Sequence, residues 1–132
     1  MKLSPNPKPF FSSLGERGER AACEFLRAKG YDILDKNYQC KIGEIDIIAR
    51  RKERLVFIEV KTRTSGQFGS PQEAVGLKKQ EKIFKLAQWY LKEKKLKEIP
   101  IAFDVVAVLW KEDRAPEIRL IMDAFEKADK GY

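Results

Sequence analysis

The chain contains no histidine among its 132 residues. Histidine supplies the usual general base of hydrolytic enzymes, many of the ligands of protein-bound zinc and the central member of the Ser-His-Asp triad. Its absence excludes such a triad and most zinc chemistry. Any hydrolysis by this protein therefore depends on carboxylates, lysine and a hard metal ion.

Cysteines and long apolar runs are also scarce. The two cysteines, Cys23 and Cys40, have neither CxxC spacing nor a disulfide framework, which favours a reducing compartment, and Cys23 is expected to be an ordinary core residue. The longest apolar run, residues 102–110, includes Asp104 and is too short to cross a bilayer, and the N-terminus lacks a signal-peptide pattern. We expect a cytoplasmic protein with no membrane partner.

Positive charge is in excess, with 27 Lys and Arg against 20 Asp and Glu, a net charge of +7. This balance suits a polyanionic partner such as nucleic acid. The length is that of one domain with a real core. Proline and lysine in residues 1–12 predict a flexible basic arm, followed by a domain over residues 13–126 and a short tail over residues 127–132.

Apolar periodicity predicts an α/β fold. Helices are expected over residues 14–29 and from residue 77 to about 95, with a further helix start at residues 70–73. Strands are expected over residues 31–37, 101–109 and 118–122, in addition to a hairpin described below. A strand, a helix and a strand in succession form a βαβ unit, so residues 101–109 should run parallel to residues 55–62. The result is a mixed sheet with an N-terminal helix and a crossover helix.

The predicted hairpin has charges inside its strands. Apolar runs at residues 45–49 and 55–60 flank a charged tip at residues 51–54, and the strands contain Glu44, Asp46, Glu59 and Lys61. A two-residue turn at Lys52-Glu53 would place Asp46 opposite Glu59 and Glu44 opposite Lys61, with all four on one face. Opposed carboxylates repel each other, and a divalent cation would relieve the repulsion.

These residues predict a metal site for phosphodiester hydrolysis. Asp46 and Glu59, with Glu19 from the edge of the first helix, are the expected ligands of Mg²⁺ or Mn²⁺. Lys61 is expected to stabilise charge in the transition state. Glu44 is a further ligand, a neighbour of the ligands or only a hairpin-end charge. The alternative for the whole set is a cross-strand salt-bridge lattice on a solvated face, although the apolar neighbours of Glu59 argue against it.

One side of the second long helix is basic. It carries Lys78, Lys82, Lys85 and Lys92 with Trp89 among them. Together with Arg63 this side predicts a nucleic-acid-binding surface, while the alternative is an ordinary solvated face.

Several short motifs carry a family resemblance. They are Gly18-Glu19, Gly43-Glu44-Ile45-Asp46, residues 57–63 (FIEVKTR) and Phe103-Asp104-Val105-Val106. Over residues 15–125 the chain resembles the YraN-like family of bacterial proteins, which is similar to the PD-(D/E)XK nuclease superfamily and to archaeal Holliday junction resolvases. The resemblance implies a restriction-endonuclease-like core with Glu19, Asp46, Glu59 and Lys61 at metal and catalytic positions. The chain departs from the pattern at Ile45, where proline is common, and at Ala102, where arginine is usual.

The sequence therefore predicts a metal-dependent endonuclease, a hydrolase acting on DNA that includes branched or junction DNA. A non-catalytic nucleic-acid-binding module of the same fold and a protein-interaction domain are the alternatives. The sequence does not decide whether the nucleic acid is DNA or RNA, or whether the protein is a monomer or a homodimer.

Overall fold

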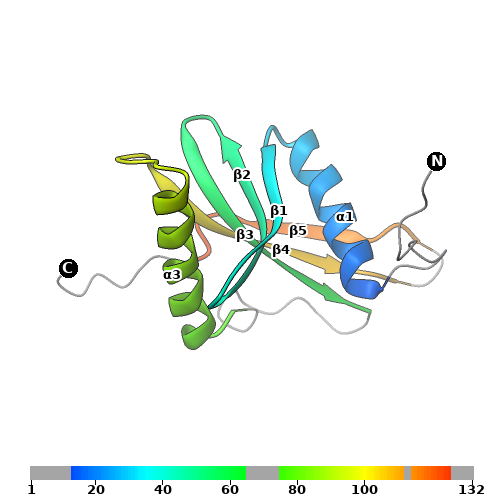
Figure 1. The fold of residues 1–132 in the computed structure, drawn as a ribbon. Coiled ribbons are helices and arrows are strands. Elements are labelled where there is room, and N and C mark those ends of the chain that lie inside the picture. The colour runs from blue at the N-terminus through cyan, green and yellow to red at the C-terminus, as the bar shows by residue number, and fades with distance from the viewer. Residues whose placement is uncertain (1–12, 65–74, 112–113, 126–132) are drawn as a thin grey trace, which may run out of the picture.

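The computed structural model describes residues 13–64, 75–111 and 114–125, which form two helices and one five-stranded sheet. The elements are α1 (Leu14–Ala28), β1 (Asp32–Cys40), β2 (Gly43–Arg51), β3 (Arg54–Arg63), α3 (Leu77–Glu93), β4 (Ile101–Leu109) and β5 (Glu117–Ile121). The strands lie side by side in chain order, and only β3 and β4 are parallel. Helices α1 and α3 cover opposite faces of the sheet (Figure 1). The predicted mixed α/β fold is confirmed.

Helix α1 begins at a capping box. The backbone N–H of Glu16 donates to Oγ of Ser13 at 3.1 Å, and the backbone N–H of Ser13 donates to Oε1 of Glu16 at 3.0 Å. These two bonds satisfy donors that a helix start otherwise leaves free. Gly30, with φ of +96°, follows the helix end in the left-handed conformation that glycine adopts without strain. The predicted helix is confirmed to within one residue.

Strand β1 is longer than the predicted strand at residues 31–37. It continues to Cys40: Asn37 lies inside it in a left-handed conformation, with φ of 53°, and the chain keeps pairing with β2 beyond this residue. Asparagine is one of the few residues besides glycine that enters this region readily. A residue expected to end the strand therefore kinks it instead.

The hairpin of β2 and β3 has the predicted turn. Arg51 pairs with Arg54 across Lys52-Glu53, and the ladder runs from there to the pair of Ile47 and Ile58. The parallel pairing of β3 with β4 and the edge position of β5 are likewise confirmed. The expected helix start at residues 70–73, the arm and the tail lie outside the described residues.

Each sheet face has its own core. On the α3 face, Phe57, Phe84 and Phe103 pack as stacked and edge-to-face aromatic pairs. On the α1 face, Leu26 and Ile58 are fully buried. Burying one large apolar side chain stabilises a fold by about 1.5–3 kcal/mol, so β3 and β4, which are buried on both faces, anchor the sheet. No helix in the described ranges is long and apolar enough to cross a membrane.

Candidate functional site

The candidate site lies where β2 and β3 stop pairing. The ladder of paired residues ends at Ile47 and Ile58, each of which lies next in sequence to Asp46 or Glu59. Oδ2 of Asp46 accepts a hydrogen bond of 2.9 Å from the backbone N–H of Val60. The carboxylate thus occupies a place that a strand carbonyl would take, and the bond fixes it next to the residue that follows Glu59. The predicted proximity of the two carboxylates agrees with this geometry.

Burial makes both carboxylates hard to ionise. Glu59 is only 5% exposed. Burial raises the pKa of Glu59 to about 7, and the negative charge of Asp46 adds to the rise. Burial also raises the pKa of Asp46 to about 6, with a further contribution from Glu19 and an opposing one from the Val60 hydrogen bond. Near neutral pH the pair therefore favours a shared proton or a bound cation.

One oxygen of Glu59 has no partner. Oε2 of Glu59 lies 3.4 Å from Nζ of Lys79, whose side chain is half exposed at the start of α3. Oε1 is buried and accepts no hydrogen bond from any described residue. A buried acceptor without a donor is costly, and such atoms in native proteins often mark an ion or a ligand.

Glu44 does not share the face of Glu59, so the prediction of four charges on one face is wrong. Ile45 packs in the core cluster of α3, whereas Ile47 packs in that of α1, although alternation should put both on the same side. The strand face therefore changes around Asp46. Glu44 instead accepts a hydrogen bond of 2.8 Å from Nδ2 of Asn37, the residue that kinks β1.

Glu19 approaches the site from α1 and is held by the same asparagine. Nδ2 of Asn37 donates to Oε1 of Glu19 at 3.0 Å. Glu19 is near enough for its charge to raise the pKa of Asp46. Within the ranges that the structure describes, no three acidic or cysteine side chains are grouped as metal ligands. Asp46 and Glu59 thus form a pair. Glu19 lies near this pair, and one of its oxygens accepts a hydrogen bond from Asn37.

Lys61 lies on the Glu59 side of the site. It follows Glu59 by two residues on β3, is partly exposed, and its charge lowers the pKa of Glu59. A lysine in this place has room to reach a ligand at the carboxylate pair.

The pair has the chemistry of a divalent-cation site. Two carboxylates whose charges repel each other, together with the unpartnered Oε1 of Glu59, suit an oxygen-seeking ion such as Mg²⁺ or Mn²⁺. Asp46 and Glu59 therefore fit a metal. One oxygen of Glu19, Oε1, is engaged by Asn37, so Glu19 is the weaker candidate for a third ligand.

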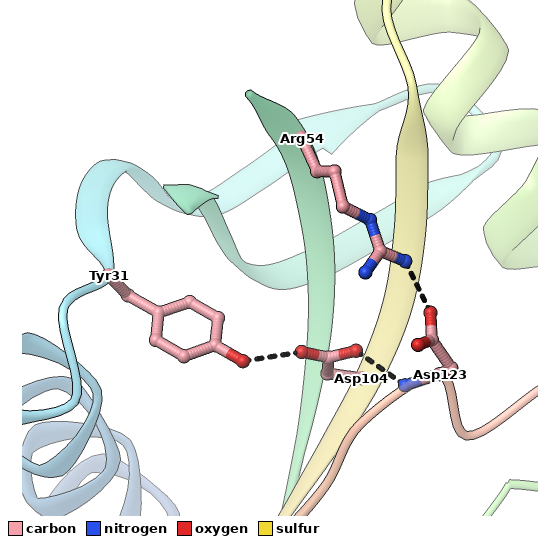
Figure 2. Close-up of polar contacts among 4 residues, drawn as sticks. All are labelled: Tyr31, Arg54, Asp104 and Asp123. Atoms are coloured by element: carbon pink, nitrogen blue, oxygen red, sulfur yellow. Dashed lines mark hydrogen bonds and ion pairs between the residues drawn. The ribbon is translucent and has the colours of Figure 1, made fainter. Parts of the chain in front are cut away.

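A second buried carboxylate, Asp104, belongs to a separate cluster (Figure 2). Asp104 is 2% exposed, and its two oxygens accept hydrogen bonds of 2.8 Å from Oη of Tyr31 and from the backbone N–H of Asp123. Asp123 in turn pairs with Arg54 at the start of β3. Burial raises the pKa of Asp104. With both oxygens engaged, Asp104 joins β4 to the start of β1 and to the segment after β5.

The basic side of α3 is exposed as expected. Lys78, Lys82, Lys85, Trp89 and Lys92 all face solvent, and Arg63 is exposed at the end of β3. Ile42, from the turn between β1 and β2, lies beside them in two shallow hollows along the helix. Contact of this surface with nucleic acid stays a prediction.

Two residues of the site were not anticipated. Lys79 was not among the lysines singled out from the sequence, yet it is the lysine that reaches Glu59. Asn37 was expected to end a strand, yet it holds both Glu19 and Glu44. An asparagine within a run that otherwise suits a strand is the one signal that pointed to a kink there.

Comparison with known proteins places these residues inside one family pattern. The pattern of "Uncharacterised protein family UPF0102" matches residues 18–108, a span that includes every predicted catalytic and metal residue. A UPF0102 protein of Caldanaerobacter subterraneus subsp. tengcongensis is 45% identical over 115 residues, covering 86% of this chain and 94% of that protein. A UPF0102 protein of Syntrophus aciditrophicus is 49% identical, covering 86% of this chain and 89% of that protein. A UPF0102 protein of Clostridioides difficile is 46% identical, covering 84% of this chain and 95% of that protein.

Proposed function

Because the chain belongs to the uncharacterised protein family UPF0102, the YraN-like family that its motifs resemble, and the family description names no activity, we propose a function from the site: a metal-dependent endonuclease that hydrolyses phosphodiester bonds of DNA. The proposal includes a restriction-endonuclease-like core and extends to branched or junction DNA. The observation that carries it is the buried Glu59, whose Oε1 has no hydrogen-bond partner among the described residues, next to the partly buried Asp46.

In this proposal Asp46 and Glu59 hold Mg²⁺ or Mn²⁺, and Glu19 is the third candidate ligand. The bound ion supplies charge neutralisation at the scissile phosphate and a water of lowered pKa. The Val60 N–H keeps the Asp46 carboxylate oriented, which removes a reorganisation step when the ligand arrives. The burial of Glu59 excludes water from one side of the pair and so strengthens its interaction with a cation.

Lys61 supplies a positive charge near Glu59. Its ammonium group would donate to a non-bridging phosphate oxygen as negative charge develops there. We therefore assign Lys61 an electrostatic role and not that of general base. The lysine side of α3 then holds the flanking phosphates of the substrate.

A non-catalytic nucleic-acid-binding module is the second candidate. It is favoured by the hydrogen bonds that Asn37 donates to Glu19 and Glu44, because carboxylate oxygens engaged in this way are less available to a metal ion. In such a module the basic surface of α3 would act without a metal.

The test is a cleavage assay with linear, flapped and four-way DNA in Mg²⁺, Mn²⁺ or EDTA. Cleavage that requires metal and falls on the order of 10²–10³-fold in Lys61→Ala supports the nuclease, because that is the usual loss when one transition-state donor is removed. Lys97→Ala, an exposed lysine beyond α3, is the matched control and should cleave normally. Binding of DNA without cleavage under every metal condition would favour the binding module.

A further inference from the structure

Trp89 is an exposed tryptophan without a ring partner. Its side chain is 49% exposed on the outer side of α3, and none of the aromatic or cation–π contacts among the described residues includes it. The other tryptophan, Trp110, is covered by the guanidinium of Arg17 at 4.5 Å from its ring centroid. An uncovered indole loses the favourable free energy of burial, so its ring is available to a ligand.

The ring lines a hollow of about 320 Å³ together with Ile42, Lys85, Gln88 and Lys92. Ile42 and Lys85 also line the next hollow along the helix, which continues past Lys82 to Lys78. The two hollows therefore form one groove, which we call the α3 groove, between α3 and the turn joining β1 to β2. The hollow beside Trp89 has a volume at the lower end of small-ligand sites, and it suits one flat ring better than a double helix.

The wall opposite Trp89 is held in place. A Cβ on Gly43 would lie 3.2 Å from Cδ of Lys82 and 3.5 Å from Cδ1 of Leu86, so the turn rests directly on α3. Tyr38 of β1 packs edge-to-face on Tyr90 of α3, with ring centroids 5.1 Å apart. A groove between two packed elements keeps its width, which favours a defined ligand over an adaptable one.

The lining combines a flat aromatic face, an aliphatic side chain and an amide with lysines on either side. Bases stack on exposed aromatic rings in proteins that bind single-stranded nucleic acid, while lysines hold the backbone on both sides of the base. A base within a duplex has both faces stacked on its neighbours and cannot offer one to Trp89. The groove suits phosphate in its charge, because among the described residues that line it Glu81 is the only acidic one, against four lysines.

We propose that the α3 groove binds an unpaired nucleotide of the substrate, with its base stacked on Trp89 and its flanking phosphates on Lys85 and Lys92. The inference rests on the proposed function in that the bound strand is part of the DNA to be cleaved. Trp89 lies ten residues after Lys79, which is about 15 Å along a helix at 1.5 Å per residue. An unpaired base in the groove thus lies a few nucleotides from Asp46 and Glu59, so the preferred substrate has a single-stranded segment next to the cleaved bond.

The experiment uses Trp89 itself as the probe and needs no cleavage. In a Trp110→Phe background Trp89 is the only tryptophan, because the chain has two. The protein is titrated in EDTA with fluorescein-labelled twelve-nucleotide oligothymidine and with a blunt duplex of the same length, and tryptophan emission and fluorescein anisotropy are followed together. We expect saturable quenching by the single strand and little by the duplex. Polyglutamate, a polyanion without bases, should leave the emission unchanged.

The matched variants separate stacking from charge. Trp89→Ala, tested without the Trp110 change, should weaken single-strand binding by roughly tenfold to a hundredfold, the range expected for losing one stacked base. Met122→Ala, which removes another exposed apolar side chain at the end of β5, should leave it unchanged.

Equal quenching by duplex, single strand and polyglutamate would overturn the inference, and so would single-strand binding that leaves Trp89 emission unchanged. Either result leaves the proposed nuclease intact if metal-dependent cleavage is found. If the protein neither binds nor cleaves any of these DNAs, both the α3-groove inference and the proposed nuclease function would be wrong.

Discussion

Nζ of Lys79 lies 3.4 Å from Oε2 of Glu59, so a lysine of α3 reaches the carboxylate pair that β2 and β3 bring together. The lysine is half exposed and the glutamate is buried, which makes the contact a partial compensation of a buried negative charge. It satisfies only one oxygen of Glu59. Under the proposed function, Lys79 would therefore compete with a divalent cation for the carboxylate of Glu59.

Lys79→Ala should lower the stability of the metal-free protein and strengthen its response to Mn²⁺. The expected loss is about 1–2 kcal/mol, below the 3–5 kcal/mol of a fully buried pair because Lys79 is half exposed. Without the competing ammonium group, each Mn²⁺ concentration should raise the melting temperature more than in the wild type. Thermal scans in EDTA and in Mn²⁺ measure both effects. Lys78→Ala, its exposed neighbour, is the control, and identical behaviour of the two variants would contradict the assignment.

Asp46→Asn should keep or raise the melting temperature without metal and lose the stabilisation by Mn²⁺. The amide oxygen of asparagine can still accept the 2.9 Å hydrogen bond from Val60, while the repulsion between Asp46 and Glu59 disappears. A salt-bridge lattice predicts the opposite, a lower melting temperature with no metal effect in either protein. Asp46→Leu is the control for the hydrogen bond and should lose about 1–3 kcal/mol, because the Val60 donor is left unpaired.

The metal-free protein should become less stable as pH rises from about 4 to 7. Burial raises the pKa of Asp46 to about 6 and that of Glu59 to about 7, whereas both are near 4 in an unfolded chain. The folded state therefore binds more protons than the unfolded state in this window, and stability falls as they are released. Urea titrations in EDTA across this range measure the slope, which should flatten in Glu59→Gln. A slope unchanged by that substitution would assign the pH dependence to other groups.

Much of the scaffold was predictable, because its signals are local. The two-residue turn at Lys52-Glu53 follows from two apolar runs around a charged tip, and the turn fixes the register as far as Ile47 and Ile58. The capping box of Ser13 and Glu16 sets the start of α1. The apolar strand β4 after a helix implies the parallel pairing with β3.

The parts that were missed depend on events that no periodicity encodes. Asn37 kinks β1 with a positive φ, the strand face changes around Asp46, and Glu44 is thereby turned away from Glu59. Alternation assumes a regular strand and cannot anticipate this. The contact of Lys79 with Glu59 depends on how α3 docks on the sheet, which the helical pattern of α3 does not specify. Asp46 and Glu59 were found because both flank the regular part of the hairpin.

Gly18→Ala tests how closely α1 approaches the strand that carries the site. A Cβ at Gly18 would lie 1.9 Å from Oγ1 and 2.9 Å from Cβ of Thr62 on β3, so α1 or β3 has to shift. We expect a loss of about 1–3 kcal/mol in urea unfolding, as for other overpacked contacts. Gly15→Ala in the same helix is the control: outside its own turn of helix, no atom of the described residues lies within 4 Å of its added Cβ, and it should be neutral or stabilising by up to about 1 kcal/mol.

A second substitution shows whether the contact itself is responsible. Thr62→Ala removes Oγ1 and Cγ2 but leaves the Cβ at 2.9 Å, so it should restore only part of the stability lost in Gly18→Ala. Because Glu19 follows Gly18, the same shift should move its carboxylate away from Asp46, and the Mn²⁺ response should weaken in Gly18→Ala and not in Gly15→Ala. Equal stability of Gly18→Ala and Gly15→Ala would show that α1 and β3 are less tightly packed at Gly18 than the distances to Thr62 indicate. Equal stability with different Mn²⁺ responses would instead separate the position of Glu19 from the packing of α1.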